Sequence, residues 1–375
     1  MGENYQHDDR IVVTLDAGGT NLVFGAMRGC RSILDRIVKP SSADDLDKCL
    51  RNIRDGFAEI IDGLDERPSA ISFAFPGPAD YANGVIAGEL PNFPTFRGGV
   101  ALGPYLEHEF GLPVFINNDG NLFAYGEAMA GTLPWLNGEL ERLGSERRYR
   151  NLIGVTFGTG FGCGIVCDGR ILSGDNGIGS YLWCTRHPFD GHLIVEEGVS
   201  IRAVKREYRR LSGDDRTLEP VDIFMIAEGG REGDKDAARE SFSLFGRCAG
   251  ASLAGVCSLV DGALVIGGGL TGAAKYIVHP MMEELSGQLA MADGVKINRV
   301  QSELIFIDGE DSLERLAAVK RASIKVHGTD ETVFYNSEWR TPVLFSRGGA
   351  SEAISAGAYV FALAALDKQT NNLYI

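Results

Sequence analysis

Three glycine-rich stretches of this chain could hold an anion: LDAGGTN at 15–21, GTGFGCG at 158–164 and VIGGGL at 265–270. Glycine lets backbone N–H groups approach a ligand closely, and a run of such groups attracts phosphate. Asp16 stands beside the first stretch and offers the hard oxygen ligand that Mg²⁺ prefers near phosphate oxygens. The pattern predicts a polyphosphate site with a magnesium ligand, and a tight β-hairpin with glycines for geometry alone is the alternative for the first stretch.

The spacing of the second stretch also resembles a dinucleotide-binding fingerprint. That motif requires a helix directly after the glycines. Here the following residues, IVCDGRI at 165–171, alternate as in a strand and then reach another turn. The pattern therefore favours a glycine-rich hairpin over a dinucleotide site.

A second candidate for chemistry is Asp119, in the polar segment NNDGN that follows an apolar stretch. A carboxylate within hydrogen-bond reach of a hydroxyl can take its proton during phosphoryl transfer. Ligands also gather at the carboxyl ends of strands in open α/β sheets. The alternative for Asp119 is a turn residue or a helix N-cap. Glu127 is a weaker candidate for a functional residue, and the alternative is that its side chain simply faces solvent.

Strands and helices alternate around these segments. The patterns predict strands at 11–15, 22–27, 70–77 and 112–121, a helix at 44–64, a hairpin at 151–172, a strand, turn and helix at 263–285, and helices at 122–131 and 350–366. This alternation is typical of the α/β class. The segments 133–150 and 286–346 have no clear pattern.

The segments 13–25 and 155–167 are alike. Each begins with Val-Thr and an apolar residue, continues through a small-residue turn and ends in a second alternating strand. We interpret this as two similar halves that face each other across a cleft, with chance similarity as the alternative.

Composition limits the kinds of function that this protein can have. The chain has 375 residues, enough for two domains, 44% hydrophobic residues and a formal net charge of −15. That charge repels phosphate backbones and anionic lipid, so we expect no nucleic-acid partner and no membrane. The N-terminus lacks the apolar core of a secretory signal, and the seven cysteines show no disulfide pattern. A cytoplasmic location is the simplest interpretation.

The motifs together resemble the ROK family of sugar kinases, within the sugar kinase, Hsp70 and actin superfamily. The most specific match is FGLPVFINNDGNLFAYGEAMAG at 110–131, and the others are LDAGGTN, FPGPAD, LPNFP, GTGFGCGIVCDGRILSGDNG and VIGGGL. The resemblance implies a two-lobed actin/hexokinase-like (ribonuclease H-like) α/β fold with a central cleft. It implies an N-terminal lobe at 1–118, a larger C-terminal lobe at 119–349 and a C-terminal helix at about 350–375 that packs back on the first lobe.

The resemblance also implies roles for individual residues. Asp119 would be the catalytic base and Asp16 a magnesium ligand, directly or through water. The residues that would bind ATP and its phosphates are Gly18, Gly19, Thr20, Gly158, Thr159, Gly160, Gly267, Gly268 and Gly269. The sugar would contact Gly77, Asn92, Asn118, Asp119 and Glu196. For Glu196, a charged residue at a helix start is the alternative.

The implied activity is phosphorylation of a hexose or N-acetylhexosamine hydroxyl by ATP with Mg²⁺. A catalytically weak or inactive sugar- or nucleotide-binding sensor of the same fold is the alternative function. The resemblance leaves the oligomeric state open, with a homodimer as one option.

One segment departs from the family pattern. The family carries Gly-Glu-Ile-Gly-His after the second glycine turn, whereas this chain has SYLWC at 180–184, with Tyr181 for Glu and Cys184 for His. No cysteine occurs in 185–200, so Cys184, His187 and His192 offer only three irregularly spaced ligands. Structural zinc needs about four, and we therefore expect none. Tyr181 and Trp183 could stack on a sugar or simply fill the space.

Overall fold

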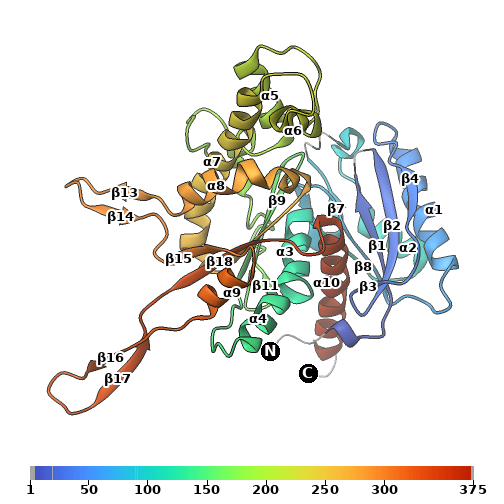
Figure 1. Ribbon diagram of the computed structural model, residues 1–375. Coiled ribbons are helices and arrows are strands. Elements are labelled where there is room, and N and C mark those ends of the chain that lie inside the picture. Colours follow the sequence, from blue (N-terminus) through green and yellow to red (C-terminus); the bar gives the residue numbers. More distant parts are fainter. Residues whose placement is uncertain (1–4, 19, 89, 91, 373–375) are drawn as a thin grey trace. The chain divides into compact units, whose positions relative to one another are not determined.

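The computed structural model describes residues 5–18, 20–88, 90 and 92–372 (Figure 1). The chain divides into two compact units. The first contains Met1–Thr132, Gly164–Ser180 and Ser346–Ile375, and the second contains Leu133–Cys163 and Tyr181–Phe345. The boundary predicted between residues 118 and 119 falls just before a helix that the structure keeps in the first unit.

The first unit is built on one mixed sheet. Its strands are β1 (Val12–Ala17), β2 (Asn21–Arg28), β3 (Arg31–Ser32), β4 (Ile37–Pro40), β5 (Ala70–Ala74) and β8 (Val114–Asn117). The order is β3-β2-β1-β5-β8, and β4 pairs with β2. Strand β1 is antiparallel to β2 and parallel to β5, which is in turn parallel to β8. The three parallel strands therefore end at the same edge.

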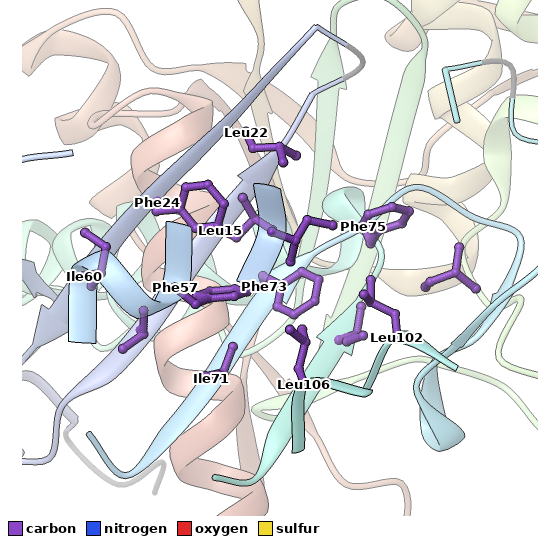
Figure 2. Close-up of a cluster of buried hydrophobic side chains, with 14 of the residues drawn as sticks. Leu15, Leu22, Phe24, Phe57, Ile60, Ile71, Phe73, Phe75, Leu102 and Leu106 are labelled. Carbon is purple, nitrogen blue, oxygen red and sulfur yellow. The ribbon is translucent and has the colours of Figure 1, made fainter. Parts of the chain in front are cut away.

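An apolar cluster covers one face of this sheet, as Figure 2 shows. It includes helices α1 (Leu46–Asp62) and α2 (Leu102–Phe110), which follow the sheet strands in sequence. The ring of Phe57 on α1 lies 5.1 Å from that of Phe24 and 5.7 Å from that of Phe73, between centroids. Asp45 caps α1 by accepting a hydrogen bond from the Lys48 N–H at 3.0 Å. This packing holds β1, β2 and β5 in register.

Two helices, α3 (Asp119–Met129) and α10 (Ala350–Asn372), pack on the other face. Ala74 contacts Leu122 and Ala358 there, while its neighbour Phe73 faces the α1 side, because adjacent strand residues point to opposite faces. The C-terminal helix thus lies on the N-terminal sheet. The remaining short elements of this unit are η1 (Tyr5–His7), β6 (Ala79–Asp80), η2 (Tyr81–Asn83), β7 (Val85–Ile86) and η3 (Pro94–Phe96). Strand β11 (Arg170–Ile171) pairs with β10 (Phe161–Cys167) at the edge of the second sheet.

The second unit has a similar sheet. Strands β9 (Leu152–Phe157), β12 (Ala263–Gly267), β18 (Arg340–Phe345) and β15 (Glu303–Phe306) lie parallel in that order, and β10 (Phe161–Cys167) lies on the outer side of β9. Each unit thus has a hairpin followed by parallel strands, as the internal similarity predicted. The elements around this sheet are α4 (Thr132–Arg142), which begins in the first unit, and η4 (Leu182–Cys184), η5 (Val195–Glu197), α5 (Ile201–Ser212), α6 (Pro220–Glu228), α7 (Lys235–Val260), η6 (Gly269–Ala273), α8 (Ala274–Leu285) and α9 (Glu310–Ala317).

Helix α7 is the one helix in the described part of the chain that is long and apolar enough, by length and composition, to cross a membrane. It contacts α5, α6 and α8. Phe242, Phe245 and Leu253 are buried along it. This packing is typical of a core helix.

Two hairpins extend from the second unit, visible in Figure 1 as thin arms. One arm is β13 (Gln288–Ala290) with β14 (Lys296–Asn298), and the other is β16 (Arg321–Lys325) with β17 (Thr332–Asn336). Both lie in the segment 286–346, in which no clear pattern was found.

Candidate functional site

Three candidate residues of the first unit follow adjacent parallel strands. Asp16 on β1 is in register with Ala74 on β5, and Ala74 is in register with Asn117 on β8. Gly77 comes three residues after Ala74, and Asp119 two after Asn117. Neighbouring strands lie about 4.8 Å apart, so the backbones at Asp16 and Asn117 are separated by roughly 10 Å. The structure thus brings Asp16, Gly77 and Asp119 to one edge of the sheet.

Asn118, rather than Asp119, is the N-cap of α3. Its Oδ1 accepts a hydrogen bond from the Gly120 N–H at 2.9 Å. Asp119 is the first helical residue, is exposed, and accepts from the same N–H at 2.9 Å. A carboxylate in the first turn of a helix lies in the positive end of its dipole. The cap therefore leaves the carboxylate of Asp119 facing outward from the strand end.

Asn117 stabilises the turn between β8 and α3. It is buried, and its Oδ1 accepts from the Asn118 N–H at 2.8 Å and from Nδ2 of Asn121 at 3.0 Å. No role was predicted for Asn117. The segment 112–121 was predicted as a strand that ends in a polar turn, and the observed strand β8 ends at Asn117, before the helix that begins at Asp119.

Asp16 lies at the start of helix α10. The Ser351 hydroxyl donates to its Oδ2 at 3.4 Å. Both residues line a small pocket with Gly25 and Ser355. Glu352 and Arg36 line the same pocket. The half-buried carboxylate of Asp16 offers the oxygen ligand that Mg²⁺ takes together with phosphate oxygens and water.

The first glycine turn closes the β1–β2 hairpin, so the hairpin named as the alternative for this stretch is present. Gly18 donates its N–H to the Asn21 carbonyl at 2.9 Å, and the Thr20 carbonyl accepts from the Ser41 N–H at 2.9 Å. Thr20 and Asn92 are exposed, and Gly19 lies outside the described residues.

The second glycine turn joins β9 to β10 in the second unit. The strand β10 follows the glycines directly, so the hairpin prediction is confirmed. A Cβ added at Gly158 would meet nothing within 4 Å, and Thr159 is exposed. The turn is therefore open to a ligand at Gly158, where the N–H donates to the Gly160 carbonyl at 3.2 Å, but not at Gly160, which Glu196 covers.

The third stretch begins in β12, which is parallel to β9 with Gly267 opposite Thr156. The second and third glycine stretches therefore lie at one edge of the second sheet. Gly268 has φ +96°, and a Cβ there would collide with the Phe157 carbonyl. A Cβ at Gly269 would meet nothing within 4 Å. Gly268 is thus needed for the turn itself, whereas Gly269 leaves the backbone open to a ligand.

Glu196 lies against the second glycine turn. Its Oε2 accepts from the Phe161 N–H at 2.9 Å, and its Oε1 pairs with Arg202 at 2.8 Å. A Cβ at Gly160 would come within 2.5 Å of its Oε2. Both carboxylate oxygens therefore already bind protein groups.

In the segment that lacks the family's zinc ligands, His187 makes hydrogen bonds with protein groups. Nδ1 of His187 accepts from the Phe189 and Asp190 N–H groups at 3.2 and 3.0 Å, and its Nε2 lies 3.4 Å from Sγ of Cys248. Burial lowers the pKa of His187 and raises the pKa of Cys248 to about 12. Cys184 and His192 are exposed, and among the described residues no group of three or more potential metal ligands occurs. Cys248 lies in an apolar helix, and its pairing with His187 left no sequence signal.

Glu127 is buried, which overturns the alternative that it faces solvent. Its Oε2 accepts from the Thr132 N–H at 2.8 Å, and its Oε1 accepts from the Ser346 hydroxyl. Thr132 and Ser346 are residues at which the chain leaves and re-enters the first unit. The carboxylate therefore joins these two points of the chain.

Known proteins resemble most of this chain. The model of the ROK family matches residues 12–303. A glucokinase of Thermotoga maritima is 26% identical over 303 residues, with 73% of this chain and 86% of the relative covered. An N-acetyl-D-glucosamine kinase of Photobacterium profundum is 32% identical over 184 residues, or 48% of this chain and 54% of the relative.

Solved structures extend the similarity to the fold. A crystal structure of glucokinase from Parabacteroides distasonis is 52% identical, has a TM-score of 0.85 and covers 96% of this chain and 99% of its own. A ROK family glucokinase from Streptomyces griseus, in complex with glucose and AMPPNP, is 22% identical with a TM-score of 0.62, covering 93% and 98%. The two-domain actin/hexokinase-like α/β fold is therefore confirmed. With the family pattern matched over most of its length, this chain belongs to the ROK family.

Proposed function

We propose that this chain is an ATP-dependent sugar kinase that phosphorylates a hexose hydroxyl, with Asp119 as the general base. The observation that carries the proposal is the placement of Asp16, Gly77 and Asp119 at the carboxyl ends of three adjacent parallel strands. Kinase relatives cover most of the chain and support the reaction class.

Asp119 suits the removal of a proton. Its carboxylate is exposed at the first turn of α3, and the cap formed by Asn118 holds the turn in place. A hydroxyl that attacks phosphorus loses its proton as the bond forms, and a carboxylate within about 3 Å can accept it. The proton would pass from the sugar hydroxyl to a carboxylate oxygen of Asp119.

The glycine turns suit the polyphosphate. We assign Gly18, Gly19 and Thr20 in the first unit, and Gly158, Thr159 and Gly160 in the second, to the phosphates of ATP. Gly267, Gly268 and Gly269 would lie beside the adenosine. Open space at Gly158 and Gly269 supports these assignments because the backbone there is free of side-chain cover.

Asp16 would hold Mg²⁺, directly or through water, with the Ser351 hydroxyl orienting its carboxylate at 3.4 Å. When bound, the ion neutralises negative charge that develops on the phosphate oxygens. No structural zinc is part of the proposal.

Glucose is the substrate that we propose. A solved glucokinase is 52% identical over 96% of this chain, which favours glucose over an N-acetylhexosamine. Gly77, Asn92, Asn118 and Asp119 would surround the sugar. Glu196 stays a proposed sugar contact, although Arg202 and Phe161 already bind its oxygens.

An assay of ADP release over a panel of hexoses and N-acetylhexosamines with Mg-ATP tests this function. We expect turnover with glucose at a higher kcat/KM than with N-acetylglucosamine or N-acetylmannosamine. Calorimetry with each sugar in the absence of ATP accompanies the assay. Sugar binding without ADP release from any sugar would contradict the kinase and support the sensor.

A further inference from the structure

Two residues of the second unit, His187 and Cys248, contact each other and have no part in the function proposed above. Nδ1 of His187 accepts two backbone N–H groups, at 3.2 and 3.0 Å, so the ring proton lies on Nε2. Nε2 therefore donates to Sγ of Cys248 at 3.4 Å. Burial raises the pKa of the Cys248 thiol to about 12, so the sulfur stays uncharged at neutral pH. A neutral hydrogen bond thus joins the loop of His187 to helix α7, on which Cys248 lies.

The loop 185–195 is closed by a backbone hydrogen bond. The His187 N–H donates to the Leu193 carbonyl at 2.9 Å. Arg247 on α7 adds a second contact with the loop, since its guanidinium lies 5.3 Å from the ring centroid of Phe189. That ring is exposed. The hydrogen bond of His187 is therefore the buried one of the two contacts with α7.

Gly198 packs directly on the His187–Cys248 pair. The short helix η5 follows the loop and ends at Gly198. A Cβ added at Gly198 would collide with Sγ of Cys248 and with Nε2 of His187. The backbone at Gly198 therefore lies on the two bonded atoms, an approach that glycine allows because it has no side chain. A displacement of the pair would move the end of η5.

Glu196 connects η5 to the second glycine turn. Its Oε2 accepts from the Phe161 N–H at 2.9 Å, and a Cβ at Gly160 would come within 2.5 Å of the same oxygen. The Gly158 carbonyl accepts from the Ile201 N–H at 2.9 Å, at the start of α5. The turn is therefore held by η5 and by the first residue of α5.

We infer that His187 and Cys248 are positioning residues for the glycine turn at 158–160. The pair supports Gly198, and Glu196, two residues earlier in the chain, binds the strand that follows the turn. Satisfied polar networks of this kind are rigid, and the placement of a reacting group is sensitive to shifts of about 1 Å. The inference rests on the proposed function in one respect, the assignment of this turn to the phosphates of ATP.

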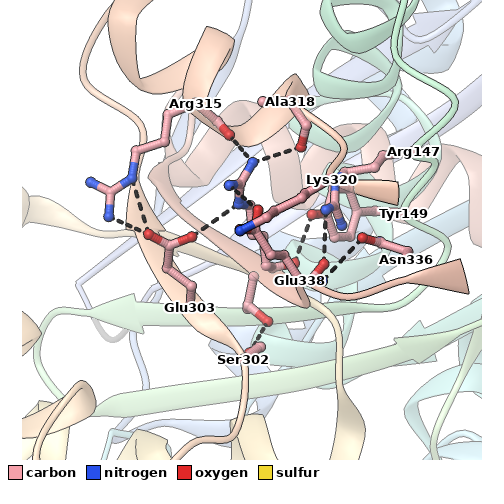
Figure 3. Close-up of polar contacts among 11 residues, drawn as sticks. Arg147, Tyr149, Ser302, Glu303, Arg315, Ala318, Lys320, Asn336 and Glu338 are labelled. Atoms are coloured by element: carbon pink, nitrogen blue, oxygen red, sulfur yellow. Dashed lines mark hydrogen bonds and ion pairs between the residues drawn. The ribbon is translucent and has the colours of Figure 1, made fainter. Parts of the chain in front are cut away.

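A second polar cluster of this unit lies away from the turn and provides a control (Figure 3). The Arg340 side chain is 10% exposed and pairs with Glu303 at 2.9 Å and with Glu338 at 2.6 Å. Arg340 and Glu303 begin β18 and β15, whereas the second and third glycine stretches lie at the carboxyl ends of the parallel strands β9 and β12. The cluster is therefore at the opposite edge of the sheet. Its disruption should lower stability without an effect on the turn.

Amide hydrogen exchange in Cys248→Ala tests the contacts themselves. The variant leaves Nε2 of His187 without its acceptor, and we expect the Phe161 amide to exchange at least about tenfold faster than in the wild type. Cys248→Ser keeps an acceptor and should restore slow exchange. Cys49→Ala removes a buried cysteine from α1 of the first unit and should leave this amide unchanged. Equal Phe161 exchange in Cys248→Ala and the wild type would overturn the inference.

ADP release and the binding of a non-hydrolysable ATP analogue test the effect on the phosphates. For Cys248→Ala we expect the KM for ATP and the dissociation constant of the analogue to rise about three- to tenfold, as for one lost hydrogen bond, with kcat unchanged. Cys248→Ser should return both to wild-type values. Glu338→Gln, in the Arg340 cluster, should lower Tm and leave both constants unchanged. A rise shared by Glu338→Gln, or no rise in Cys248→Ala, would overturn the inference.

The outcomes distinguish this inference from the proposed function. A wild type that releases no ADP with any sugar would contradict the kinase, while amide exchange and analogue binding still decide the role of the pair. In the wild type itself, NMR of the histidine rings with labelled nitrogen should show a proton on Nε2 of His187 that exchanges slowly with water. A proton on Nδ1 instead would overturn the inference even if Cys248→Ala does not fold.

Discussion

His187 is held in the neutral form by its hydrogen bonds. Nδ1 accepts two backbone N–H groups, and a proton on that nitrogen would break both bonds. Burial lowers the pKa of His187 below its ordinary value of 6.5. The unfolded chain therefore binds this proton at a higher pH than the folded chain does.

We predict a pH-dependent stability from this residue. The contribution of neutral His187 to the free energy of unfolding is fully present above pH 6.5, the pKa of this residue in the unfolded chain. It is lost as the pH falls from there through the lower pKa of the folded state. Urea unfolding between pH 7.5 and pH 5, which crosses the unfolded-state value, should show a steeper fall in the wild type than in His187→Asn, which keeps an acceptor. The exposed control His192→Asn should keep the wild-type slope. Equal slopes in all three proteins would contradict the prediction.

Two neighbouring glycines should respond differently to the same change. At Gly268, alanine would take a left-handed φ and collide with the Phe157 carbonyl, so we expect the free energy of unfolding to fall by about 1–3 kcal/mol. At Gly269, alanine meets open space. There we expect unchanged stability and a severalfold higher KM for ATP. Denaturation and steady-state kinetics of both variants check this pair, and a Gly269→Ala enzyme with wild-type KM would remove that backbone from the ATP site.

Residue types predicted part of this chemistry. Asp16 and Asp119 stood out because carboxylates rarely end apolar strands without a reason, and the structure places them at one sheet edge. Asn117 was not singled out, although its partners Asn118 and Asn121 are close in sequence. Glu127 was only a weaker candidate and Cys248 was none, because Ser346 and His187, which they contact, lie far away along the chain. Whether a carboxylate is buried depends on such partners, which local patterns do not specify.

The helix pair α3–α10 depends on two glycines. A Cβ at Gly126 would collide with the Ala353 carbonyl, and one at Gly357 with the Leu122 carbonyl. The backbones therefore pack in direct contact, and α3 begins with Asp119.

We predict that Gly357→Ala pushes α3 away from α10. The expected loss of stability is about 1–3 kcal/mol, with a lower kcat because Asp119 moves with its helix. Gly255→Ala, also within a helix but facing open space, should raise stability by up to about 1 kcal/mol. Chemical denaturation of the two variants measures both effects. Equal stability changes would show that the close packing is unimportant.

Most elements near the site could be predicted because each has its own periodicity. The hairpin around Gly18, the helix α1 and the strand, turn and helix at 263–285 lie where the patterns placed them. The arms could not be predicted in the same way. Their strands are short and form separate two-stranded sheets, so no long periodic segment marks them in the sequence.

At the scale of the whole molecule, each compact unit has residues of the proposed function at an edge of its own sheet. Asp16 and Asp119 lie in the first unit, and the glycine turns at 158–160 and 267–269 lie in the second. The repeated hairpin-and-parallel-strand pattern explains why each unit offers one edge of strand ends. The family fold followed from motifs spread along the chain, whereas the division at Thr132 depends on the packing of α3 against α10, which no motif encodes.

The most direct test of the account is the turnover number of Asp119→Asn with glucose and Mg-ATP. We predict that kcat falls by about 10²–10⁴-fold, because the amide cannot accept the proton, while the dissociation constant for glucose changes little. Asp62→Asn, which removes one charge from an exposed position at the end of α1, should keep the wild-type kcat. An Asp119→Asn enzyme with wild-type kcat would contradict the account.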